Sequence, residues 1–169
     1  MATQKPRSRD RAVARTVRMV PVTSARTTAT ARRLFREYAA AVGEPRCFAN
    51  FAQEVEQLPA PYIAPSGSLL LAKVGRRSVG VVGARPWSPR ICEMKHLFVR
   101  PEFRGRGIGR ALAEAIVEEA RRIGYARMRL DSLESMKVAR TMYRDMGFRE
   151  IGPYFPPTGA PTHYMELRL

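Results

Sequence analysis

Apolar residues recur at the three- and four-residue spacing of an amphipathic helix in three parts of the chain. The clearest pattern starts at Ile108 and ends at Gly124. Two others cover residues 28–43 and 134–147, and each closes on a glycine, a residue that commonly ends helices. A shorter pattern over residues 49–57 predicts one more helix. The chain therefore contains four predicted helices.

Short apolar or alternating runs, bounded by glycine, proline and turn residues, predict the strands. These runs cover residues 17–22, 68–75, 75–86, 91–99, 126–131, 148–151 and 163–169. The predicted order is a strand, two helices, three strands, a helix, a strand, a helix and two strands. This order indicates a mixed α/β (α+β) domain built on a central sheet, without an internal repeat.

Length and composition favour one folded domain over residues 16–169. Residues 1–15 are rich in arginine and nearly devoid of apolar side chains, which predicts a disordered basic extension. Cys47 and Cys92 form neither a zinc motif nor a disulfide framework, so we expect no metal and a reducing, cytoplasmic location. No apolar run approaches the length of a membrane span, so no membrane partner is expected.

The formal net charge is +15, from 30 Lys and Arg against 15 Asp and Glu. Such an excess indicates an acidic partner. Nucleic acid, an anionic membrane and a phosphorylated ligand would all meet this condition. A solvated, arginine-rich surface is an equally simple explanation, and charge alone leaves these alternatives open.

The stretch RGRGIGRAL at residues 104–112 places three glycines between a predicted strand and the clearest helix. A G-x-G-x-x-G dinucleotide loop is excluded, because Arg110 stands where the third glycine is required. The G-x-x-x-x-G-K-[ST] triphosphate loop has no match. Glycines that free the backbone, a helix N-terminus and several arginines together predict a phosphate site. A merely flexible helix start is the alternative.

Two motifs in this half of the chain resemble signatures of the GNAT-type N-acetyltransferases. R-x-x-G-x-G at residues 104–109 is similar to that family's [RQ]-x-x-G-x-[GA] loop. A-x-x-x-Y-x-x-x-G-F at residues 139–148 resembles its second signature. The resemblance covers residues 16–169, and it implies a mostly antiparallel sheet of about seven strands flanked by about four helices.

The resemblance implies acetyl-CoA as the co-substrate. The strand over residues 94–99 would then splay from the one over 127–131, with pantetheine in the gap, paired to free backbone groups of Leu97 and Val99. A backbone N–H near Leu97 or Phe98 would stabilise the oxyanion. The CoA diphosphate would be wrapped by Arg104, Gly105, Arg106, Gly107, Ile108, Gly109 and Arg110.

Acetyl transfer to an amine requires a base and benefits from an acid. Glu93 lies eleven residues before Arg104, where histone-type members of the family carry a glutamate base, and Tyr143 matches the family's tyrosine acid. A strand glutamate paired with a lysine or arginine, and a core tyrosine, are the simpler explanations. Many members also carry Asn seven residues before the tyrosine. This chain has Met136 there, and Ser135 is the candidate replacement.

The resulting expectation is acetyl transfer to the primary amine of a small molecule or amino acid, by direct attack on the thioester. The expected acceptor contacts are Lys95, His96, Phe51 and Tyr154, with Lys95 holding an acceptor carboxylate. A peptide or protein N-acetyltransferase is one alternative, and a basic nucleic-acid-binding module is another. Family analogy alone favours a homodimer.

Overall fold

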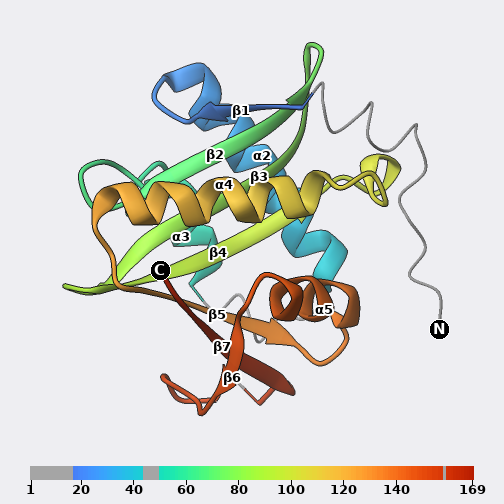
Figure 1. Ribbon diagram of the computed structural model, residues 1–169. Coiled ribbons are helices and arrows are strands. Elements are labelled where there is room, and N and C mark those ends of the chain that lie inside the picture. The colour runs from blue at the N-terminus through green and yellow to red at the C-terminus, as the bar shows by residue number, and fades with distance from the viewer. Residues whose placement is uncertain (1–16, 44–49, 158) are drawn as a thin grey trace.

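The computed structural model describes residues 17–43, 50–157 and 159–169. The predicted basic extension and Cys47 lie outside these residues. The strands are β1 (Val17–Pro21), β2 (Ser68–Val74), β3 (Arg77–Ser88), β4 (Ile91–Val99), β5 (Arg127–Leu133), β6 (Arg149–Ile151) and β7 (Thr162–Arg168). The helices are α2 (Ala25–Val42), α3 (Phe51–Gln57), α4 (Ile108–Ile123) and α5 (Lys137–Asp145), with a 3₁₀ turn at Pro101–Phe103. The predicted order of elements is confirmed (Figure 1).

One seven-stranded sheet runs through the molecule in the order β1-β2-β3-β4-β5-β7-β6. Every neighbouring pair is antiparallel except β4 and β5, which are parallel. The predicted mixed, mostly antiparallel sheet is therefore confirmed. Pro21 ends the edge strand β1, a position where proline is tolerated.

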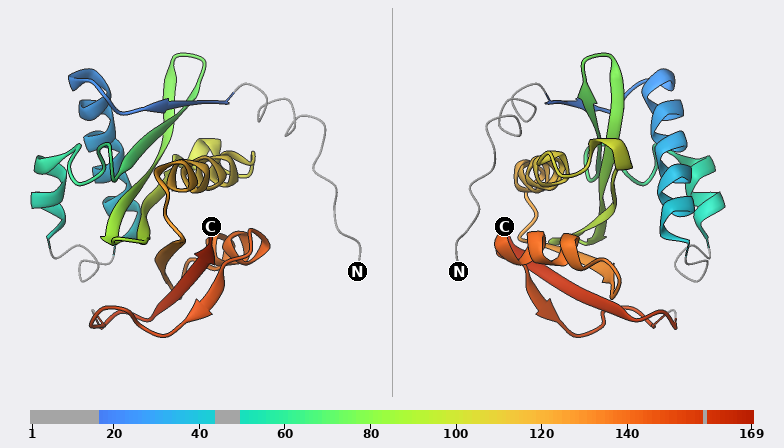
Figure 2. Two further views of the ribbon diagram at one scale, coloured as in Figure 1. Left: turned by 60° about the vertical axis from the view of Figure 1, so that its left-hand side comes forward. Right: turned by 90° about the vertical axis from the view of Figure 1, so that its right-hand side faces the viewer.

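The two faces of the sheet carry separate cores, because side chains alternate along each strand. Helix α4 covers one face, and α2 with α3 covers the other (Figure 2). Leu112 and Ile116 of α4 pack on the first face together with Met128 of β5. Leu34 and Phe35 of α2 pack on the second. Cys92 is fully buried in the first core, as its small size predicts, and burial raises the pKa of its thiol to about 12.

The main helices begin and end where their capping residues predict. Ser24 caps α2 with its hydroxyl on the Thr27 N–H, and Gly43 ends the helix in a left-handed conformation. Gly124 closes α4 in the same way. Helix α3 is fastened to α2 by Arg32, whose guanidinium donates to three backbone carbonyls at the end of α3. A cation at a helix C-terminus satisfies exposed carbonyls and complements the helix dipole.

Several boundaries differ from the predictions: α2 starts at Ala25 instead of residue 28, and β5 continues to Leu133 instead of residue 131. Strand β3 continues past Pro86 to Ser88, because the β3–β4 hairpin stays paired up to Ser88 and Ile91. Helix α5 starts at Lys137 instead of Glu134. The Arg140 guanidinium donates to the carbonyls of Leu133 and Glu134 at 2.6 Å each, so the backbone forms a turn before the helix begins. Within the described residues, no helix combines the length and apolar character that a membrane span requires.

Candidate active site

The central feature of the sheet is a fork between β4 and β5. These strands pair through only three residues each, Ile91–Glu93 with Arg127–Arg129, and then diverge (Figure 1). A cavity of about 50 Å³ lies in the opening. Its lining comes from β4, β5, α2 and the start of α5: Tyr38, Val42, Met94, Lys95, His96, Asp131, Leu133 and Met136. The predicted splay of the two strands is thus present.

A bulge in β4 lies at the fork. On the β3 side, Lys95 pairs with Gly83 and Phe98 with Val81, so the ladder passes over His96 and Leu97. His96 has φ +55°, and it is the only described non-glycine residue with a positive φ. Non-glycine residues with positive φ are uncommon and concentrate at functional sites. Since β5 has already diverged, the side of β4 that faces β5 has no strand neighbour at the bulge among the described residues.

The glycine loop lies beyond the end of β4 and leads into α4. Gly105 and Gly107 have φ +72° and +77°, and a Cβ on either would meet no atom within 4 Å. The first backbone bond of α4 runs from the Ala111 N–H to the Gly107 carbonyl, so the N–H groups before it are available to a ligand. Such a terminus attracts phosphate through both hydrogen bonds and the helix dipole.

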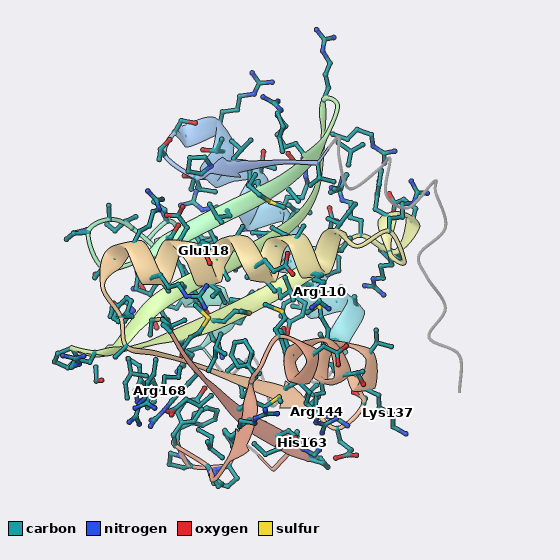
Figure 3. All side chains as sticks on the ribbon, in the orientation of Figure 1. Arg110, Glu118, Lys137, Arg144, His163 and Arg168 are labelled. Carbon is teal, nitrogen blue, oxygen red and sulfur yellow. The ribbon has the colours of Figure 1, made fainter. Side chains whose placement is uncertain are left out.

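The arginines of this loop contact the protein itself. Arg104 donates from Nε to the Val99 carbonyl at 2.9 Å, and Arg106 donates to the Glu102 carbonyl at 3.0 Å. Arg110, labelled at the start of α4 in Figure 3, pairs with Glu114 at 2.9 Å. The anion-binding capacity of the loop therefore rests on backbone N–H groups, with the arginines adding positive charge around them.

Glu93, the predicted base, is 1% exposed, and both of its carboxylate oxygens accept hydrogen bonds. Arg85 of β3, its cross-strand partner, donates Nε–H and NH2 to Oε2, both at 2.9 Å. The Tyr154 hydroxyl donates to Oε1 at 2.9 Å, and the Lys95 ammonium lies 3.8 Å from the same oxygen. Buried carboxylates require such partners, because desolvation of an unpaired charge is costly.

Lys95 links Glu93 to the cavity. Its ammonium donates to Asp131 of β5 at 2.9 Å across the fork. Burial alone would lower the pKa of Lys95, but the carboxylates of Asp131 and Glu93 raise it above its ordinary value, so the side chain stays charged. Two carboxylates of the protein therefore already lie beside Lys95.

His96 also lines the cavity, and its ring lies 4.6 Å from that of Phe35 and 5.5 Å from that of Phe51, centroid to centroid. Its Nε2 meets Oε1 of Glu54, from α3, at 2.9 Å. The Tyr62 hydroxyl donates to the same oxygen. Burial alone would raise the pKa of Glu54, but these hydrogen bonds and charges lower it to about 2. Burial lowers the pKa of His96, so the imidazole is neutral at pH 7.

Comparison with known proteins bears on this arrangement directly. The sequence profile of the acetyltransferase (GNAT) family matches residues 29–148, which include the fork, the bulge and the glycine loop. An uncharacterized N-acetyltransferase of Schizosaccharomyces pombe is 33% identical over 138 residues, which are 80% of this chain and 85% of the yeast protein.

The chain belongs to the GNAT acetyltransferase family. N-acetyltransferase 8B of Rattus norvegicus is 35% identical over 101 residues, covering 56% of this chain and 46% of the rat protein. The chain thus spans about half the length of that relative. At the level of the family, the prediction of an acyl-CoA-dependent N-acetyltransferase is confirmed.

Solved GNAT structures share the fold. An acetyltransferase of Streptococcus agalactiae superposes with a TM-score of 0.73 at 18% identity, over 91% of this chain and 99% of that chain. A GNAT acetyltransferase of Elizabethkingia anophelis with acetyl-CoA bound has a TM-score of 0.60 at 17% identity, over 91% and 99%. At these identities the likeness concerns the fold alone.

Tyr143 of this GNAT domain lies in α5, on the first core, 6% exposed. Its ring centroid is 5.6 Å from that of Phe148. Burial raises the pKa of its phenol above the ordinary value, and the nearby Tyr38 and Asp131 add to the effect. The phenol therefore keeps its proton at neutral pH and can act as a donor. Asp131 and Tyr38 line the fork cavity, whereas Tyr143 is not among its lining residues.

The residues present fit a CoA-type ligand. The fork offers unpaired backbone groups in an open position, and the glycine loop offers N–H groups with free space in front of two glycines. Across the residues that the structure describes, no group of three or more His, Cys, Asp or Glu side chains is arranged to bind a metal ion. A larger groove, of about 1040 Å³, lies between the start of α2 and the end of α4, and no predicted site residue lines it.

Sequence reasoning missed Arg85, Glu54 and Asp131. Arg85 was accessible in principle, because the β3–β4 hairpin register places it opposite Glu93. Asp131 lies at the end of a predicted strand, but its hydrogen bond with Lys95 across the fork depends on tertiary structure. Glu54 lies 42 residues before His96 on a separate helix, and no local pattern connects them.

Proposed function

We propose that this GNAT protein transfers the acetyl group of acetyl-CoA to the primary amine of a small molecule or amino acid. The observation that carries the proposal is the β4–β5 fork followed along the chain by the glycine loop at the start of α4, an order that supports an extended thioester in the fork and its diphosphate at the loop. The fold shared with an acetyl-CoA-bound acetyltransferase supports the choice of co-substrate.

In this proposal the backbone of β4 and the glycine loop bind different parts of the co-substrate. Leu97 and Val99 bind the pantetheine arm, and a backbone N–H of Leu97 or Phe98 stabilises the oxyanion. The diphosphate is held at the start of α4 by the N–H groups around Gly107, within the segment 104–110. Ser132, next to Asp131 on β5, has a buried hydroxyl without a partner among the described residues.

Glu93 and Tyr143 supply the proton transfers. Glu93 accepts the proton that the acceptor ammonium must lose before its nitrogen can attack. The nitrogen then bonds to the thioester carbonyl carbon, and the carbon–sulfur bond breaks as the tetrahedral species collapses. The nitrogen loses its second proton in this collapse, and that proton restores the phenol of Tyr143 after Tyr143 has protonated the sulfur. Tyr143 gives its proton to the departing sulfur, which its neutral phenol permits.

The acceptor enters from the face covered by α2 and α3, where Phe51, His96 and Tyr154 lie. Asp131 and Glu93 already balance the charge of Lys95, so the proposal rests on the acceptor amine, and an acceptor carboxylate held by Lys95 stays a prediction. A peptide or protein N-terminus is the alternative acceptor. The nucleic-acid alternative is not favoured, since the described site offers a thioester path and no interleaved basic and aromatic surface.

The test is a thiol-release assay with acetyl-CoA over a panel of amino acids, monoamines, diamines and short peptides. Turnover with a small amine supports the proposal, and turnover with peptides alone moves the acceptor to the alternative class. Calorimetry with CoA tests the co-substrate separately. Absence of CoA binding would overturn the proposed mechanism, whatever the acceptor.

A further inference from the structure

The two oxygens of the Glu93 carboxylate have different surroundings. Oε2 is held by Arg85 through two hydrogen bonds of 2.9 Å. Oε1 accepts only one hydrogen bond of that length, from the Tyr154 hydroxyl, with the Lys95 ammonium further away at 3.8 Å. With 1% of the residue exposed, an acceptor amine cannot touch the carboxylate while these partners stay in place. A proton can therefore reach Glu93 only through one of them.

Tyr154 is the partner that extends outward. It lies in the loop between β6 and β7 and is half-buried. Both views of Figure 2 show this red loop extending to the side of the sheet that α2 and α3 cover, the proposed acceptor side. The ring is fixed by the neighbouring rings of Trp87, Phe155 and Tyr164, with centroids 5.0 to 5.5 Å away, and by the Arg129 guanidinium 5.2 Å above it.

We propose that the Tyr154 hydroxyl relays the proton from the acceptor ammonium to Glu93, a role that rests on the proposed function. The ammonium N–H gives its proton to the Tyr154 oxygen as the Tyr154 O–H gives its own to Oε1 of Glu93. One N–H and one O–H bond break, and two O–H bonds form. The amine becomes neutral, Glu93 becomes a carboxylic acid, and Tyr154 ends as it began.

The charges around the pair favour this route. Burial, followed by the Glu93 charge, raises the pKa of Tyr154, so the tyrosine is a neutral hydroxyl that can donate and accept at once. Lys95 cannot replace it, because the lysine stays protonated and has no lone pair to offer. The titratable or charged side chains that face the pair are Arg85 from β3, Lys95 from β4, Arg129 and Asp131 from β5, Glu54 from α3, and Tyr164 and Glu166 from β7.

The experiment compares Tyr154→Phe with the wild type on two nucleophiles. One is the best amine of the panel, which is protonated at pH 7, and the other is hydroxylamine, which is uncharged at that pH. Loss of the relay should lower kcat/KM for the protonated amine by about 100-fold. Hydroxylamine has no ammonium proton to lose before attack, so its kcat/KM should stay within a few-fold of the wild-type value.

Two further variants complete the test. Tyr125→Phe is the matched control: it also deletes a phenol hydroxyl, one bonded to the Ser66 carbonyl, and should leave both reactions unchanged. Glu93→Gln should reproduce the selectivity of Tyr154→Phe, and the double variant should be no slower than either single one, because both residues act in one proton path.

An equal loss on both nucleophiles would assign Tyr154 a structural role and overturn the relay. Independent, additive losses in the double variant would also overturn it. If Glu93→Gln is impaired and Tyr154→Phe is not, Glu93 remains the base and takes its proton by another route, which overturns the relay as well. If the wild type acetylates no amine, the proposed function itself fails, and that result is distinct from the others.

Discussion

Glu93 shows how a single buried charge is retained in this sheet. Arg85 stands directly opposite it on β3, and the bidentate contact offsets part of the cost of removing the carboxylate from water. Truncating one member of such a pair leaves the other charged and unpaired, which costs about 3–5 kcal/mol. Variants that probe the function of Glu93 should therefore keep an acceptor for Arg85, which the amide oxygen of glutamine provides.

A single substitution at Tyr143 can separate the packing of its ring from the chemistry of its hydroxyl. Tyr143→Phe keeps the ring that packs against Phe148 and removes only the proton donor. We expect kcat to fall by about 10²–10⁴-fold, the usual contribution of a general acid, with CoA affinity unchanged. Steady-state kinetics and CoA calorimetry on the same preparation check this. A wild-type kcat would leave Tyr143 as a core aromatic.

At the scale of single residues, sequence reasoning reached the groups that lie on the family motifs and on β4. It named Glu93, Lys95, His96 and Tyr154, but not that Tyr154 donates to Glu93 over a separation of 61 residues. A long-range side-chain contact of this kind depends on how the β6–β7 loop folds back, which no periodicity records.

The glycine loop acts as an element with α4, because its conformation decides where the first N–H groups of that helix point. Gly107 caps α4 with φ +77°, and no atom lies within 4 Å of the position that a Cβ would take. Gly107→Ala should thus cost about 1–2 kcal/mol of stability from the left-handed conformation, without a clash. Gly107→Ala should also weaken the binding of CoA to the folded protein, beyond any loss that the lower stability explains. Calorimetry on folded protein measures this affinity.

Gly43→Ala is the matched control for this element. Gly43 also has a left-handed conformation, φ +64°, with nothing within 4 Å of an added Cβ, but it ends α2 away from the loop. A similar loss in thermal stability with unchanged CoA affinity is expected. If both variants bind CoA as the wild type does, the loop is not the diphosphate site.

Element boundaries followed the sequence where a capping residue sets them. Gly43 and Gly124 stand at the predicted ends because their backbone preferences are local. The start of α5 was placed too early, because the carbonyls that would begin the helix are instead taken by the Arg140 side chain. Side-chain competition for backbone groups cannot be seen in a hydrophobic pattern.

Across the whole molecule, positive charge exceeds negative charge twofold, 30 residues against 15. On α4 the arginines are balanced locally, since Arg121 pairs with Glu118, labelled in Figure 3, and Arg122 pairs with Glu119. Surface pairs of this kind add little stability. The remaining excess favours association with a phosphorylated co-substrate at low ionic strength, and salt should weaken it.

Binding of CoA should stabilise the folded chain as a unit. A ligand at 100 times its Kd adds about 2.7 kcal/mol to the free energy of unfolding. For a domain of this size, that increase corresponds to a rise in Tm of about 5–10 °C. Thermal unfolding with and without CoA measures the shift, and Gly107→Ala should reduce it. A Tm independent of CoA would contradict the proposed site.

The fork gives the sheet two strand edges in its interior that face no neighbouring strand, because β4 and β5 diverge after three residue pairs. Unpaired strand edges expose N–H and C=O groups, which can form hydrogen bonds with an extended chain that lies beside them. A pantetheine arm, with its two amide groups, is suited to fill such a gap as if it were a missing strand. If the pantetheine arm binds there as proposed, it joins the two parts of the sheet while the co-substrate is bound, and the gap opens again after each turnover.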